Sequence, residues 1–352
     1  MLRRGDAGAA VAEVRARLAH LGYLHATHAD ASLSEEFDAE LDRAVRTFQQ
    51  ERGLTVDGIV GTDTFRRLDE ARWRLGDRVL RFVPGHLLTG DDIAELQKRL
   101  NQLGFDAGRA DGAFGRQTDT ALREFQRSVG EPADGTCGPE TFRSFERLVR
   151  TVSGGNAAKL RDPLTITALQ TGIADKVVVI DPGFDEDDPE ASAIAQAIAS
   201  RVEGRLAALG TQVFLTRSAA SALPDDTSRA DFANRSNADL MLSIHCDRVA
   251  SAKPNGVATF YFGAPDDGAF SYAGRALAEQ IQVELCARTR MHNNRSHPRT
   301  WDLLRMTRMP AVRVDVGYLS NPQDRARLSR EEHQDLLAAG IATAISRFCM
   351  PI

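Results

Sequence analysis

The chain has 352 residues, of which 42% are hydrophobic and 26% are charged, so it is a globular protein of two or three domains and not a disordered chain. Its 44 basic and 49 acidic side chains give a net charge of -5, which excludes a general attraction to nucleic acid or to an anionic membrane. The sequence contains no apolar run long enough to span a membrane, and its charged N-terminus lacks the apolar core of a signal peptide. The four cysteines are widely scattered, as expected of reduced thiols. We therefore expect a cytoplasmic protein.

The N-terminal half contains a duplicated pattern. One amphipathic helical period ends in Leu21-Gly22-Tyr23, and a second ends in Leu103-Gly104-Phe105. The residues that follow each turn also match in order and spacing. In the first copy they are Phe37, Ala44, Phe48-Gln49, Gly53, Asp57-Gly58, Gly61 and Thr64-Phe65, and in the second copy Phe114, Ala121, Phe125-Gln126, Gly130, Asp134-Gly135, Gly138 and Thr141-Phe142. The repeat predicts two compact three-helix units, at 3–72 and 86–148.

Both units resemble the peptidoglycan-binding module found beside bacterial cell-wall hydrolases. The resemblance rests on the Leu-Gly-aromatic turn, the Phe-Gln pair and the Asp-Gly-x-x-Gly-x-x-Thr-Phe ending. It implies binding of a glycan or of its stem peptide. The alternatives are a module that has turned to protein–protein contacts and a generic helical bundle whose repeated residues serve only the core. Residues 149–174 have no sustained period and are interpreted as a linker with a lead-in strand.

The pattern changes after this linker, where β-branched runs alternate with helical periods. Such alternation predicts a three-layer α/β domain with a mainly parallel sheet over 175–350. In sheets of this kind, ligands bind at the carboxyl ends of the strands. The expected strands lie at 177–180, 213–216, 240–244, 258–262 and 311–316, and the expected helices at 190–209, 227–236, 268–288 and 330–348.

Six short motifs at the ends of these strands carry a second resemblance, to the zinc-dependent N-acetylmuramoyl-L-alanine amidases of the Amidase_3 type. The resemblance implies hydrolysis of the amide bond between N-acetylmuramic acid and L-alanine. It also implies a zinc ion held by a His-Glu-His set, with a glutamate near the last strand as general base. The motifs are Asp181-Pro182-Gly183, Thr216-Arg217, Ser243-Ile244-His245, Asn255-Gly256-Val257, Met309-Pro310-Ala311-Val312 and Gly317-Tyr318-Leu319-Ser320-Asn321-Pro322.

The implied catalytic set is incomplete in this chain. The first ligand position holds Phe184 and the second Ala191, neither of which has a lone pair for zinc, so His245 is the only retained ligand. Asp315 stands at the general-base position and is one methylene shorter than glutamate. We therefore predict a protein without bound zinc. We expect Asp181, Phe184, His245 and Asp315 to form the cleft, with the Phe184 ring filling the space of a metal ion.

Two polar segments leave alternatives open. The acidic run from Asp185 to Glu190 could join His245 and Asp315 in a substitute metal site, although most charge runs are solvated loops. His292 and His297 lie in a polar segment that we interpret as a loop, where they are surface residues or substrate contacts.

The complete architecture, two repeats and a zinc-stripped amidase domain without an export signal, resembles an actinobacterial group within the amidase family. The resemblance implies a cytoplasmic, non-hydrolytic pseudoenzyme that regulates peptidoglycan precursor synthesis. Its implied protein partners are enzymes or regulators of that synthesis and a Ser/Thr kinase, and a muropeptide or glycan is a further ligand. The alternative is a zinc-dependent N-acetylmuramoyl-L-alanine amidase with an unorthodox metal site.

Overall fold

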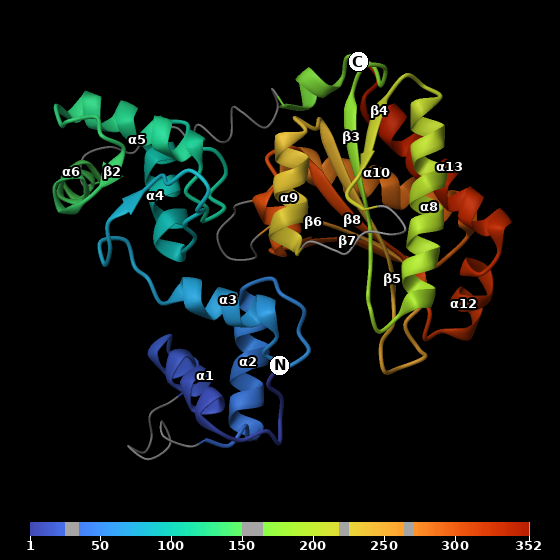
Figure 1. Cartoon of the computed structure of the whole chain (residues 1–352), viewed down its shortest axis with the longest axis horizontal. Helices are drawn as coiled ribbons and strands as arrows, with labels where there is room; N and C mark the ends of the chain where they lie inside the picture. The colour runs from blue at the N-terminus through green and yellow to red at the C-terminus, as the bar shows by residue number, and fades with distance from the viewer. Residues whose placement is uncertain (25–34, 150–164, 218–224, 264–269, 352) are drawn as a thin grey trace. The chain divides into compact units, whose positions relative to one another are not determined.

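The computed structural model describes residues 1–24, 35–149, 165–217, 225–263 and 270–351, which form an N-terminal and a C-terminal compact unit (Figure 1). Within these ranges, no helix is both long enough and apolar enough to cross a membrane. Of the predicted linker, residues 150–164 lie outside the described ranges. Residues 165–169 are helical and 170–174 contain no strand, so the described part of this segment does not hold the expected lead-in strand.

The N-terminal unit contains two three-helix bundles, as predicted. Each bundle closes on its own apolar core, and in each core the aromatic residue of the Leu-Gly turn packs edge-on against the phenylalanine of the Phe-Gln pair. The first bundle consists of α1 (Ala9–His20), α2 (Ala39–Glu51) and α3 (Thr62–Ala71); the second consists of α4 (Asp91–Gln102), α5 (Arg116–Val129) and α6 (Pro139–Val149), with the short antiparallel strands β1 (Leu80–Arg81) and β2 (Thr136–Cys137).

A buried glutamine explains why the Asp-Gly turns recur. In the second bundle, Gln126 donates from Nε2 to Asp134 Oδ1 at 2.9 Å and accepts at Oε1 from the backbone N–H of Gly135 at 2.9 Å. Gln49 makes the same two bonds to the Asp-Gly turn of the first bundle. The turn is thereby fixed against the preceding helix, with its glycine at a positive φ.

The structure reveals a third glutamine that binds an Asp-Gly turn in this way, which the comparison of the two sequence repeats missed. Gln97 of α4 donates to Asp111 Oδ1 at 2.9 Å and accepts from the N–H of Gly112 at 2.9 Å. The repeated unit is therefore a helix, an Asp-Gly turn and the next helix, and it is shorter than the three-helix bundle.

We expect Gln126→Ala to lower the free energy of unfolding of the second bundle by about 1–3 kcal/mol, because the change leaves the buried Gly135 N–H without its acceptor and removes the side-chain amide that ties the Asp134 carboxylate to the helix. Urea unfolding and loss of hydrogen-exchange protection at the Gly135 amide measure the effect. Gln117→Ala is the matched control, since Gln117 is exposed and bonds only to the side chain of Asp106. Equal losses in the two variants would show that the buried glutamine has no special role.

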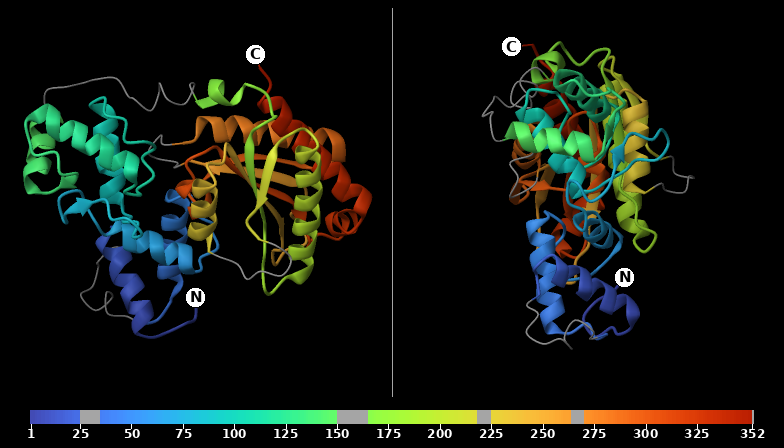
Figure 2. Two further views of the ribbon diagram at one scale, coloured as in Figure 1. Left: turned by 45° about the horizontal axis from the view of Figure 1, so that its top comes forward. Right: turned by 90° about the vertical axis from the view of Figure 1, so that its left-hand side faces the viewer.

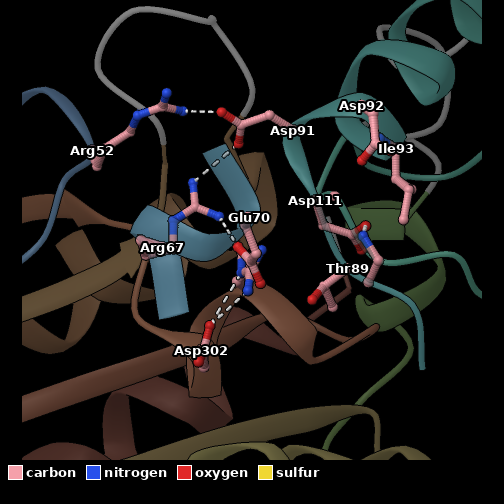
Figure 3. A network of polar contacts seen from close by, with 12 residues as sticks. Arg52, Arg67, Glu70, Thr89, Asp91, Asp92, Ile93, Asp111 and Asp302 are labelled. Atoms are coloured by element: carbon pink, nitrogen blue, oxygen red, sulfur yellow. Dashed lines mark hydrogen bonds and ion pairs between the residues drawn. The ribbon is translucent and has the colours of Figure 1, made fainter. Parts of the chain in front are cut away.

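Ion pairs join the two bundles inside the N-terminal unit (Figure 3). Arg52, at the end of α2, contacts the Asp91 carboxylate at 2.6 Å. Arg67 of α3 lies 3.9 Å from the same carboxylate and 2.5 Å from Glu70. Asp91 is the first residue of α4, so its charge also lies favourably at a helix N-terminus.

The C-terminal unit is a three-layer α/β domain with a mainly parallel sheet, which confirms the predicted fold class. The strand order is β4-β3-β5-β8-β6-β7, and the β6–β8 pair alone is antiparallel. The strands are β3 (Val177–Pro182), β4 (Gln212–Leu215), β5 (Leu240–Asp247), β6 (Val257–Phe262), β7 (Asn293–Arg299) and β8 (Ala311–Tyr318); the helices are α8 (Pro189–Ala207), α9 (Asp226–Arg235), α10 (Tyr272–Thr289), α11 (Asp302–Met306), α12 (Pro322–Leu328) and α13 (Glu331–Phe348).

The two faces of this sheet have separate cores (Figures 1 and 2). The helices α8, α10 and α13 cover one face, where Ile180, Ile244 and Val314 lie in a large apolar cluster. The helices α9 and α11 cover part of the other face, with a smaller cluster around Met241 and Phe260. Because these two helices cover only part of the second face, polar side chains can lie there at the ends of the strands.

The segment interpreted as a polar loop is the strand β7, which corrects the sequence prediction. It pairs in parallel with β6, and His297 lies opposite Phe260. Among the strands of the sheet, β7 is an edge, so one side of it faces no further strand and polar side chains are tolerated there. Its polar composition hid it from a search for apolar runs.

Candidate functional site

The carboxyl ends of β3, β5 and β8 bring together three of the four predicted cleft residues, Asp181, His245 and Asp315. Asp181 lies opposite Ser243 on the neighbouring strand, and His245 lies opposite Asp315. Because side chains alternate along a strand, these four side chains share the sheet face opposite the large apolar core. The structure thus places His245 and Asp315 on adjacent strands in register.

Asp181, Ser243 and His245 form a hydrogen-bonded chain. The Ser243 hydroxyl lies 2.6 Å from Asp181 Oδ2 and 2.8 Å from His245 Nε2. A hydroxyl has one proton and a carboxylate only accepts, so Ser243 donates to Asp181 and accepts from an N–H at His245 Nε2. The remaining lone pair of the imidazole is then on Nδ1, and the ring lies so close to Gly183 that a Cβ on that residue would be 2.5 Å from Nδ1.

The Asp181 carboxylate is fully buried and has three donors. Thr216 donates to Oδ1 at 2.5 Å, and Arg229 of α9 donates from Nη1 to Oδ2 at 2.8 Å, beside the bond from Ser243. Arg229 also pairs with Asp226 in the first turn of the same helix. Asp181 therefore organises this end of the sheet.

His245 is held in its neutral form. Burial lowers the pKa of His245 well below the usual range, and the positive charges of Arg313, Arg229 and Arg217 lower it further. Three guanidinium groups thus surround the only retained histidine of the implied zinc set. Positive charge at these positions opposes the approach of a dication as well as a proton.

Asp315 is buried and is paired with an arginine on its own strand. Its side chain is almost wholly inaccessible, with 2% of the residue exposed, and Arg313 Nε donates to its Oδ1 at 2.7 Å. Burial raises the pKa of Asp315, and the Arg313 charge opposes that rise. The carboxylate at the general-base position therefore has a fixed cationic partner.

Phe184 is located differently from the prediction. Its ring is 38% exposed and packs on the guanidinium of Arg217, whose Cζ lies 5.1 Å from the ring centroid. The expectation that this ring fills the space of a metal ion is wrong. The reason is Arg217, which donates to the backbone oxygens of Gly183 and Ser192 and so presents a flat cationic surface to the ring.

Ala191 and Glu190 point in different directions. Ala191, in the first turn of α8, is buried in the large apolar core. Glu190 instead accepts from Arg248 at 3.1 Å and from Arg325 at 2.9 Å. The position aligned with the lost glutamate ligand therefore faces inward, and the neighbouring glutamate is held outside by two arginines.

The acidic run has structural partners of its own. Asp188 caps α8 by accepting from the N–H of Ala191, and Arg248 binds its carboxylate at 2.5 Å, which lowers the pKa of Asp188. The backbone of Asp185 is bonded to Ser192. Across the described ranges, no group of three or more His, Cys, Asp and Glu side chains is placed to hold a metal ion.

The remaining candidates lie away from His245. His292 is exposed, while His297 of β7 bonds through Nε2 to the backbone oxygen of Asn294 at 2.6 Å. The sequence reasoning missed Arg229 and Arg313 as site residues. Arg217 belongs to the Thr216-Arg217 motif, but it was not among the predicted site residues. An arginine inside a helical period or a strand does not by itself indicate a functional site.

Comparison with known families agrees with both resemblances. A family model described as N-acetylmuramoyl-L-alanine amidase matches residues 178–347, and a model of a peptidoglycan binding domain matches residues 7–68 and 89–144. The two matches to the binding domain cover the two helical bundles, and the amidase match covers the sheet from β3 to α13.

Three individual proteins are similar to this chain, and the first of them by itself shows the family. N-acetylmuramoyl-L-alanine amidase CwlM of Mycobacterium tuberculosis is 46% identical over 98% of this chain and 89% of its own length. N-acetylmuramoyl-L-alanine amidase LytC of Bacillus subtilis is 29% identical over 49% of this chain and 35% of its own length. Among solved structures, the catalytic domain of CwlV from Bacillus (Paenibacillus) polymyxa var. colistinus has 30% identity and a TM-score of 0.45, covering 49% of this chain and 97% of that chain.

Proposed function

The chain belongs to the N-acetylmuramoyl-L-alanine amidase family, and from that premise we propose that it is a catalytically inactive member that regulates peptidoglycan synthesis through binding. The amidase domain then serves as a scaffold, and the two peptidoglycan-binding bundles supply further contacts. The proposed setting is the cytoplasm, and the proposed partners are enzymes or regulators of precursor synthesis and a Ser/Thr kinase. A muropeptide or glycan is the proposed small ligand.

The observation that carries this proposal is the state of His245. Its one free lone pair, on Nδ1, lies against Gly183, and the charges of three arginines act on the ring. Zinc sites in proteins take three or four ligands with free lone pairs. Phe184 and Ala191 provide none, so the donors present argue against a zinc site.

The zinc-dependent amidase remains the second candidate, because His245 and Asp315 lie in register on adjacent strands. Against it, Asp315 is bonded to Arg313 and is almost wholly buried. A general base has to reach the proton that it removes, and here Oδ1 of the carboxylate already accepts from a fixed cation.

We expect the purified full chain to contain far less than one zinc ion per molecule and to leave a muropeptide uncleaved. Elemental analysis after dialysis against zinc, together with chromatography of a muropeptide incubated with the protein, measures both. An active amidase assayed alongside provides the positive control. If the protein instead holds about one zinc ion per chain, loses it in His245→Ala and releases free stem peptide, it is a hydrolase and the proposal is wrong.

The regulatory part of the proposal needs its own measurement. Adding the purified chain to a reconstituted precursor-synthesis reaction should change its rate. His245→Ala should leave that change intact, because no hydrolysis is involved. An effect that needs both His245 and added zinc would contradict a role as an inactive scaffold.

A further inference from the structure

Two arginines and a tryptophan form a compact cluster on the cleft side of the sheet. The guanidinium of Arg313 on β8 lies 4.6 Å from the centroid of the Trp301 ring, and that of Arg299 on β7 lies 5.9 Å from it. Phe260 of β6, between the two strands, packs on Trp301 with centroids 4.8 Å apart. We call Arg299, Trp301 and Arg313 the Arg–Trp–Arg cluster.

Most donors of this cluster are unused by the protein. Among the described residues, the Arg313 guanidinium donates only from Nε, to Asp315. Arg299 donates from Nη1 to the backbone oxygen of Pro298 at 3.0 Å, and its buried Nε has no partner within the described ranges. A buried donor without an acceptor is costly, so an unused N–H at this place indicates that an acceptor from outside is expected.

The charges in the cluster point the same way. Burial lowers the pKa of Arg299, and so does the nearby Arg313 charge, against the attraction of Asp315. Asp315 is hydrogen-bonded to Arg313 and acts on Arg299 through its charge alone, while Asp247 and Asp226 act on Arg313 more weakly. Asp226 is itself paired with Arg229. Of the two guanidinium groups, only that of Arg313 thus has a hydrogen-bonded carboxylate among the described residues.

The cluster is connected to the cleft and is partly open. Arg313 is two residues from Asp315, which lies opposite His245, and the Arg313 side chain is 23% exposed. A guanidinium stacked on an aromatic ring keeps its in-plane N–H groups free, and these match the two oxygens of a carboxylate or phosphate. Because His245 is neutral, it contributes no charge to this part of the cleft.

We infer that the Arg–Trp–Arg cluster is an oxyanion-binding subsite of the cleft, which takes a phosphate or carboxylate group of the bound ligand. The inference rests on the proposed function only in treating the cleft as a binding site. The oxyanion has two natural sources in cell-wall chemistry: the diphosphate of an activated precursor and the carboxylates of the stem peptide. Asp315 remains hydrogen-bonded to Arg313, and the oxyanion of the ligand accepts hydrogen bonds from the remaining N–H groups of both arginines.

The fluorescence of Trp301 can report this binding in the full chain. The chain contains two tryptophans, so Trp73→Phe leaves Trp301 as the single reporter. We expect saturable changes on titration with sodium pyrophosphate or with N-acetylmuramoyl-L-alanyl-D-isoglutamine, at constant ionic strength. The probe that binds more tightly identifies the diphosphate or the carboxylate as the source.

Arg299→Gln should weaken that binding by about tenfold or more, since charge-assisted hydrogen bonds are lost. Arg295→Gln is the matched control, because it removes the same charge from an exposed position on β7. Arg313→Gln is a second test, accepted only if its far-UV circular dichroism is native, because it also frees Asp315. Absence of saturation with both probes, or equal weakening by Arg295→Gln and Arg299→Gln, would overturn the inference. The zinc and hydrolysis measurements are independent of this titration, so failure here leaves the proposed function standing.

Discussion

Phe184→His combined with Ala191→Glu is expected to raise bound zinc from near zero to about one ion per chain. The two changes restore the ligand types that the family resemblance implies beside His245. Position 184 already lies beside the histidine, because Gly183 is against the His245 ring and Arg217 bonds both the Gly183 and the Ser192 carbonyl oxygens. Ala191 faces the large apolar core, so a glutamate placed there has to turn out of that core to reach the zinc ion.

The residues around the restored site disfavour zinc binding. Zinc has to bind His245 at Nδ1, which lies against Gly183, and it has to approach Arg229 and Arg313. We therefore expect the affinity of the double variant to lie below that of an active family member. The affinity should rise with increasing salt, since screening weakens the repulsion between these like charges.

Calorimetric titration with zinc measures this gain, and the double variant combined with His245→Ala is the control that should lose it. We expect little hydrolysis from the double variant, because Asp315 is bound to Arg313. Adding Asp315→Glu should bring measurable cleavage of a muropeptide. A double variant that folds normally and takes up no zinc would show that Ala191 is not the glutamate position, and Glu190 would have to be tested instead.

Much of the site could be predicted because its residues stand in short motifs at strand ends. The order of the motifs was enough to place Asp181, His245 and Asp315 at one edge of a parallel sheet, where the structure has them. The apolar residues of β3, β5 and β8 made these strands visible, since strands buried on both faces are mostly apolar.

Other features left no signal of this kind. The strand β7 is polar because it lies at a sheet edge, and the third Gln–Asp-Gly device interrupts the three-helix repeat that the comparison followed. The outward position of the Phe184 ring depends on Arg217, which comes from a different strand end. Contacts between distant side chains decide such details, and local pattern does not contain them.

Asp181→Ala is expected to have the largest effect on stability, lowering the free energy of unfolding of the C-terminal unit by about 3–5 kcal/mol. The carboxylate is fully buried and accepts from Thr216, Ser243 and Arg229. Its removal leaves a guanidinium with a side chain only 12% exposed beside two hydroxyl groups that have lost their acceptor. Removing one member of a buried ion pair costs more than removing both, because the remaining charge is uncompensated.

Urea unfolding followed by Trp301 fluorescence in the Trp73→Phe background isolates the C-terminal unit from the helical bundles. Asp226→Asn is the matched control, since it removes the more exposed carboxylate bound to the same arginine, and it should cost about 1 kcal/mol or less. A loss below about 1 kcal/mol for Asp181→Ala would contradict a structural role for this carboxylate.

The double variant Asp181→Ala with Arg229→Met separates the charge from the packing. If the cost of Asp181→Ala comes mainly from the stranded guanidinium, the double variant should be more stable than the single one, and the coupling energy should be about 1–3 kcal/mol. If the two losses simply add, the hydroxyl groups of Thr216 and Ser243 carry the cost. In that case Ser243 is free to turn, and the Nε2 proton of His245 loses its acceptor. The same buried carboxylate thus holds the strand ends together and, through Ser243, fixes the orientation of the His245 ring.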